Sequence, residues 1–97
     1  MLIDFSQELK SLSGEPFLKE EGKVALLGDM CVAALLSEKP NAPAPAVDKL
    51  KRWELAKLVY GKGEVELKAE DIVLIKKAAG EVFAPALMGV MYDLLEV

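Results

Sequence analysis

Four carboxylates crowd the segment 61–71 and make it the strongest candidate in the chain for holding a metal ion. They are Glu64, Glu66, Glu70 and Asp71. An EF-hand calcium loop needs oxygen ligands at fixed positions around a central glycine, and no register of this segment provides them. The sequence has one cysteine and no histidine, which excludes a structural zinc or iron site. We therefore predict no metal site and no cofactor.

No group of residues in the sequence forms a recognisable catalytic set. Histidine, the usual general base near neutral pH, is absent. Cys31 lies on the apolar stripe of a predicted helix, where a thiol is ordinarily a small, inert core side chain. The serines have no base in view, and the paired acids of the chain are typical of solvated charges. These features predict that the protein is not an enzyme.

Length and composition indicate a small globular protein that does not bind nucleic acid. The 97 residues predict a single domain, 1–97, and the apolar content of 53% is too high for a disordered chain. The net charge of −4 repels phosphate backbones. The nearest feature to a basic patch is a set of four cations spread around one predicted helix: Lys49, Lys51, Arg52 and Lys57. A solvated helix face is the favoured interpretation of that set.

Cysteine usage and hydropathy bear on the compartment. Because Cys31 is alone, it has no partner for an intramolecular disulfide, which favours a reducing compartment. The opening residues lack the basic and apolar regions of a secretory signal. The longest uncharged apolar run falls well short of the roughly 20 residues that cross a bilayer. We expect a cytoplasmic protein without a membrane partner.

The first half of the sequence predicts a β element followed by a helix. In residues 1–26 the opening positions alternate apolar and polar side chains, and a turn signal with glycine and proline follows at 13–16, so a β-hairpin or extended arm is expected. A helix is predicted over 27–37, where apolar residues recur at helical spacing. These are Leu27, Met30, Cys31, Ala34 and Leu35. The prolines and alanines of 38–46 predict a semi-rigid linker.

The remaining segment, 47–97, predicts a helical body. Its first helix spans about 47–60, with an apolar set of Leu50, Trp53, Leu55, Leu58 and Val59. The next begins at Ala69 and has an inner stripe of Ile72, Ile75 and Ala79. Gly80 is expected to break or bend the chain, and Pro85 is acceptable only in the first turn of the last helix. The predicted fold is mainly α, a small four-helix domain with a short N-terminal β-hairpin or extended arm.

The segment 82–92 carries no charge and is apolar on every side. Such a helix has to be covered, and a chain of this length has little protein with which to cover it. Burial between partners and complete wrapping by the other helices are equally compatible with the sequence. The candidate interface residues here are Phe83, Leu87, Met88, Val90, Met91, Tyr92, Leu94 and Leu95. Trp53 and Tyr60 share a helix face, where they serve as core anchors or, alternatively, as anchors for a partner.

Several short patterns follow one another along nearly the whole chain. They are an Ile-Asp-Phe opening, a Leu-x-Gly-x-Pro turn at 12–16, Leu-Gly-Asp before the helix at 27–36, Arg-x-Glu-Leu-Ala at 52–56, an acidic and apolar run at 64–76, and a closing pattern of Gly80, Pro85, Leu87, Gly89 and Leu94-Leu95-Glu96. This order resembles a family of small proteins of tailed bacteriophages and prophages. The resemblance implies a phage or prophage origin and a function not assigned in the family. It carries over no catalytic or binding residue.

These observations predict a non-enzymatic, phage-derived protein that acts by binding protein. The expected form is a homodimer through the last helix, so that replacing Met91 with Glu should split it. One alternative is a phage head or tail assembly accessory that covers a structural protein. The other is a small regulator of a host protein.

Overall fold

The structure, a computed structural model, describes residues 1–19, 22–37, 46–61 and 63–95. Within these ranges the chain forms four α-helices and one two-stranded antiparallel sheet. The elements are β1 (Leu2–Asp4), α1 (Leu27–Leu36), α2 (Ala46–Val59), β2 (Glu64–Glu66), α3 (Ala69–Val82) and α4 (Pro85–Leu95). The predicted mainly α fold with a short N-terminal β element is confirmed. The predicted linker lies outside the described residues, except for Ala46, which begins α2.

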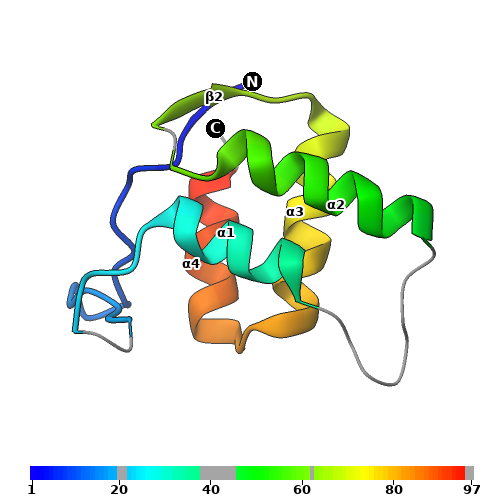
Figure 1. Ribbon diagram of the computed structural model, residues 1–97. Coiled ribbons are helices and arrows are strands. Elements are labelled where there is room, and N and C mark those ends of the chain that lie inside the picture. The colour runs from blue at the N-terminus through cyan, green and yellow to red at the C-terminus, as the bar shows by residue number, and fades with distance from the viewer. Residues whose placement is uncertain (20–21, 38–45, 62, 96–97) are drawn as a thin grey trace.

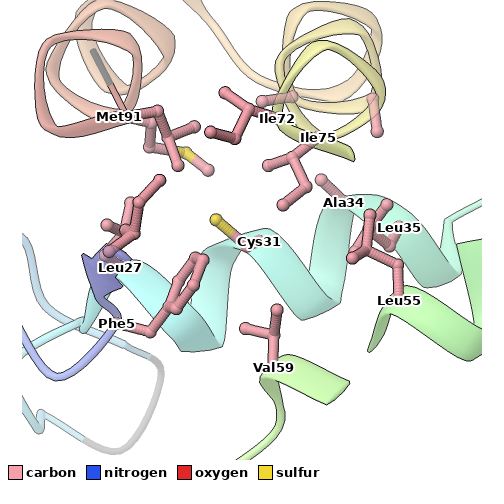
Figure 2. Packing of buried hydrophobic residues seen from close by; sticks show 14 of the residues in the cluster. Phe5, Leu27, Cys31, Ala34, Leu35, Leu55, Val59, Ile72, Ile75 and Met91 are labelled. Carbon is pink, nitrogen blue, oxygen red and sulfur yellow. The ribbon is translucent and has the colours of Figure 1, made fainter. Parts of the chain in front are cut away.

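Helix α1 is the centre of the molecule, because α2 packs on one side of it and α3 on another, while α4 packs on α3. In Figure 1, α1 and α2 run across the front and α3 and α4 cross behind them. Contacts on two sides bury the stripe that was predicted for α1, with Met30 only partly covered. Figure 2 shows Leu27 and Cys31 on the side of α1 that faces Met91 and Ile72.

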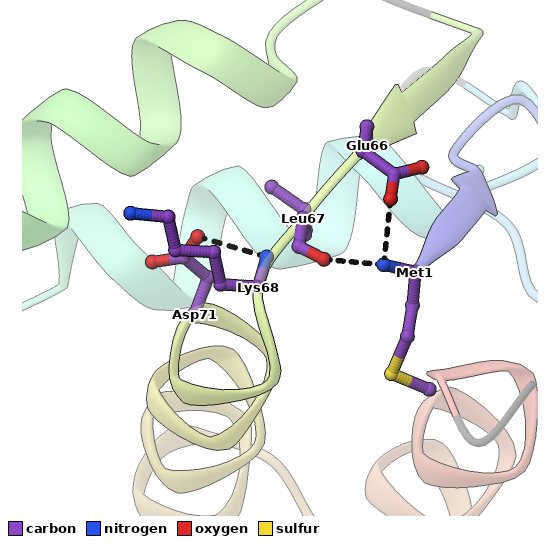
Figure 3. Close-up of polar contacts among 5 residues, drawn as sticks. All are labelled: Met1, Glu66, Leu67, Lys68 and Asp71. Carbon is purple, nitrogen blue, oxygen red and sulfur yellow. Dashed lines mark hydrogen bonds and ion pairs between the residues drawn. The ribbon is translucent and has the colours of Figure 1, made fainter.

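The N-terminal strand pairs with a segment far along the chain and not with its sequence neighbours. Leu2 lies opposite Glu66, and Ile3 lies opposite Val65. The amino group of Met1 extends this pairing, because it donates to the Leu67 carbonyl at 2.6 Å and to the Glu66 carboxylate at 3.0 Å (Figure 3). Of the two forms expected for residues 1–26, a β-hairpin or an extended arm, β1 takes the second, because its partner is β2, between α2 and α3. Isolated antiparallel bridges join residues further along the same segment, such as Lys10 with Pro16 and Leu18 with Val24.

Residues 7–19 and 22–26 form an N-terminal cap, a small non-helical unit beside α1 that has an eight-residue repeat. The amide of Phe17 donates to the carbonyl of Leu9, the amide of Ala25 donates to that of Phe17, and the amide of Leu9 donates to that of Ala25. Each of these three residues is thus bonded to the other two in a closed ring. Gly14 and Gly22, also eight residues apart, both have positive φ and turn the chain between successive members of the ring. The three ring side chains lie in or against the core.

Helix α3 runs through Gly80 and ends at Val82, so of the break or bend expected at this glycine, the break does not occur. The glycine is explained by the close approach of α4. The hydroxyl of Tyr92 donates to the Lys76 carbonyl at 2.6 Å, and a Cβ atom added at Gly80 would lie 3.0 Å from that hydroxyl oxygen. Gly80 therefore leaves room for a hydrogen bond between two helices. Pro85 stands in the first position of α4, as predicted.

Gly80→Ala should lower the free energy of unfolding by about 1 kcal/mol, because the new methyl group displaces the Tyr92 hydroxyl and weakens its hydrogen bond. In a Tyr92→Phe background the same change should raise the free energy of unfolding by about 1 kcal/mol, since alanine favours a helix over glycine. Urea denaturation of the two single variants and the double variant measures this coupling. Equal effects of Gly80→Ala in both backgrounds would contradict it.

Candidate functional site

The C-terminal helix, the expected interface, belongs largely to the core. Met91 and Leu95 are fully buried, because α4 lies along α3 with this edge turned inward. The other apolar candidates of this segment are partly buried, and most of them pack against the core: Phe83, Leu87, Met88, Val90, Tyr92 and Leu94. An interface of the folded chain therefore cannot include Met91 or Leu95, and the use of the other six stays a prediction.

Helix α2 presents the opposite situation, because it exposes more of its apolar residues than it buries. Its buried stripe consists of Leu55, Ala56 and Val59. The apolar residues exposed on this helix or directly after it are Val47, Leu50, Trp53, Leu58 and Tyr60. Of the predicted apolar set of this helix, only Leu55 and Val59 are buried. Helix α2 packs chiefly on α1, so a narrow stripe is enough to hold it and both of its flanks stay open.

One flank of α2 forms an apolar groove with α1, which we call the aromatic groove. It has a volume of about 340 Å³ and is lined by Val32, Leu36, Trp53, Ala56, Lys57 and Tyr60. Trp53 is 50% exposed and Tyr60 is 70% exposed. The ammonium group of Lys57 lies 5.8 Å from the centre of the Trp53 ring, which places a positive charge at the rim. Trp53 and Tyr60, which were predicted to share a helix face, both line this groove at the surface, although Tyr60 directly follows the end of α2.

The other flank of α2 forms a second groove with α3, which we call the α2–α3 groove. Its apolar lining consists of Leu50, Leu55, Leu58, Val73 and Leu74. Charges of both signs surround this lining: Asp48, Lys51, Arg52, Glu54, Glu70, Asp71 and Lys77. The Arg52 guanidinium lies 3.6 Å from the Glu81 carboxylate, and this ion pair joins α2 to α3. The Nε atom of Arg52 is buried and has no hydrogen-bond partner among the described residues. Sequence spacing alone had assigned Arg52 to a solvated face.

The carboxylates of the segment 61–71, which suggested a metal site, do not gather at one place in the fold. Glu66 accepts a bond from the amino group of Met1, and the Asp71 carboxylate accepts the backbone amide of Lys68 at the start of α3. Glu70 lies in the first turn of that helix, where a negative charge opposes the helix dipole. In the part of the chain that the structure describes, no three acidic, cysteine or histidine side chains gather as metal ligands.

None of the helices within the described ranges is long and apolar enough to cross a membrane.

Cys31 is a core side chain, and burial raises the pKa of its thiol to about 12. Because the ordinary value is 9.0, the protonated thiol favours the folded state below pH 9, and this contribution is lost as the pH rises toward 12. At pH 8 we expect Ellman's reagent to modify the native thiol at least roughly a hundredfold more slowly than the thiol of the urea-unfolded chain. Equal rates in the two states would contradict this placement.

Comparison with known proteins found no matching family model, no matching curated protein and no matching solved structure.

Proposed function

We propose that this chain is a non-enzymatic protein that works by binding another protein in the aromatic groove. The observation that carries the proposal is the exposure of Trp53 and Tyr60 over an apolar floor between α1 and α2. Tryptophan and tyrosine supply much of the binding energy at protein interfaces, because each buries a large rigid surface and loses little side-chain entropy. Neither ring is needed to close the core, since Leu55, Ala56 and Val59 already hold α2 in place.

The groove also defines the chemistry of the partner segment. Its floor is almost entirely apolar, and Lys57 stands at its rim. A segment that fits would present apolar side chains to Trp53 and Tyr60 and an acidic side chain to Lys57. An amphipathic helix or an extended strand both meet these requirements.

The resemblance to small phage and prophage proteins supports a client among phage structural proteins. In that case the chain is an assembly accessory that covers an apolar segment of a head or tail protein. A host protein as the client would make it a regulator instead. The cytoplasm of a bacterial host suits both roles.

The test is affinity capture from the bacterial host during phage or prophage induction. We expect a phage structural protein to be enriched on the wild-type chain and lost on a Trp53→Ser, Tyr60→Ser double variant. Leu12→Ser is the matched control, because Leu12 is fully exposed and distant in sequence from the groove. Circular dichroism checks that all three proteins are folded. Equal recovery of the client on the double variant would contradict the groove as the binding site.

A further inference from the structure

We propose that α2 pairs antiparallel with α2 of a second copy of this chain, each helix lying in the α2–α3 groove of the other. This inference rests on the proposed function only in taking the chain as one that acts through protein contacts. It places self-association on α2 and leaves the aromatic groove, on the opposite flank of the same helix, open for a client.

The sequence of α2 is complementary to its own reverse. In an antiparallel pair with a two-fold axis between Arg52 and Trp53, residues equally distant from that point face each other. On the face of α2 that lies outside its buried stripe and away from the aromatic groove, the facing pairs are Val47 with Leu58, and Lys51 with Glu54. Apolar residues meet apolar residues, and each acid meets a base. A two-fold interface requires this property, because the same patch contributes both of its sides.

The structure leaves the outward members of these pairs accessible. Val47 is more than half exposed, and Leu58 is nearly so. Lys51 is exposed and forms no ion pair in the described part of the chain. Within the described ranges Glu54 pairs only with Lys57 of the same helix, at 3.2 Å, and such exposed pairs contribute little to stability. These charges are therefore available to the second copy.

The α2–α3 groove provides a seat for the incoming helix. Its apolar lining includes Leu58 and Leu74, which receive the apolar positions of the second α2. On the far rim, Glu70 and Lys77 of α3 add one charge of each sign. A partner helix with charges of one sign would leave the like-charged side chains of the rim unpaired or repelled. A second copy of α2, running antiparallel, brings side chains of both signs. Charge complementarity thus favours a second copy over another protein.

The test uses charge reversal and measures mass by sedimentation equilibrium. The wild-type chain should have twice the 10.5 kDa mass of one chain at sufficient concentration. Lys51→Glu sets its new carboxylate against Glu54 of the second copy, and Glu54→Lys sets its new ammonium group against Lys51. Each single variant should raise the dimer dissociation constant at least about tenfold, since two like-charge contacts replace two ion pairs. Lys10→Glu, an exposed site outside α2, is the matched control and should leave the constant unchanged.

Two restorations distinguish direct pairing from damage to the fold. The double variant Lys51→Glu, Glu54→Lys should dimerise like the wild type, because every facing pair is again complementary. An equimolar mixture of the two single variants should form heterodimers. The Lys51→Glu chain carries acids at both positions and the Glu54→Lys chain carries bases at both, so opposite charges face each other only when the two variants pair. Direct pairing alone predicts both results.

A wild-type chain that stays monomeric at millimolar concentration would overturn the inference and leave client binding in the aromatic groove intact. A dimer that neither single variant weakens would also overturn it. Self-association would then have to use another surface, such as the partly buried residues of α4. Loss of client capture on the Trp53 and Tyr60 variant is a separate readout. The two proposals therefore fail separately.

Discussion

Met91→Glu should unfold the protein and not merely divide a dimer. Met91 is fully buried, and Figure 2 shows it on the inner side of α4, facing Ile72 and Cys31. No basic side chain among the described residues is buried in this core, so a carboxylate there would be unpaired. An uncompensated buried charge costs about 3–5 kcal/mol or more. That is comparable with the whole stability of a domain of this size, roughly 5–15 kcal/mol.

Circular dichroism and urea denaturation measure this effect. Ala86→Glu is the matched control, because it introduces the same carboxylate on an exposed position of α4. We expect the control to unfold within about 0.5 kcal/mol of the wild type. A Met91→Glu chain that keeps a cooperative transition near that of the wild type would show that the packing of α4 is not as described.

Gly28→Ala should lower the free energy of unfolding by about 1–3 kcal/mol, the usual cost of overpacking. A Cβ atom at this position would lie 3.0 Å from the Phe5 carbonyl oxygen and 3.1 Å from the Phe5 Cβ atom. Both are held by the backbone, since the amide of Gly28 donates to that same carbonyl at 2.8 Å. The N-terminal segment would have to move away from α1, and the buried ring of Phe5 would move with it.

Gly89→Ala in α4 controls for the change in helix propensity. An added Cβ atom meets nothing within 4 Å there, so this variant should be more stable by up to about 1 kcal/mol. Thermal unfolding should then show opposite shifts of the melting temperature for the two glycine-to-alanine variants. Shifts of the same sign would mean that the crossing of Phe5 over α1 does not restrict Gly28.

Local patterns in the sequence were sufficient to locate the helices. Periodicity placed α1 within one residue at each end, and it identified the inner stripe of α3, to which the structure adds only Ala78. Pro85 marked the start of α4, because proline fits the first turn of a helix and disrupts later ones. These successes depend on steric preferences that act within a few residues along the chain.

The errors arose where distant contacts decide the outcome. Gly80 suggested a helix break, but its role is to admit the Tyr92 hydroxyl from the next helix. On α2, the apolar residues outnumber those that one neighbouring helix can cover, so the sequence could not tell which of them are buried. The pairing of β1 with β2 joins segments about 60 residues apart, and no local pattern specifies such a partner.

The eight-residue repeat of the N-terminal cap also limits how this protein can change in length. Repeats that stack in an open row can gain or lose a unit, because each unit contacts only its neighbours. Here the backbone amides and carbonyls of three residues, Leu9, Phe17 and Ala25, form a closed cycle of three hydrogen bonds. A duplicated unit would have to open that cycle and separate Leu9 from Ala25. Insertions are therefore expected to be tolerated in the turns at Gly14 and Gly22, whereas duplication or deletion of a whole unit is not.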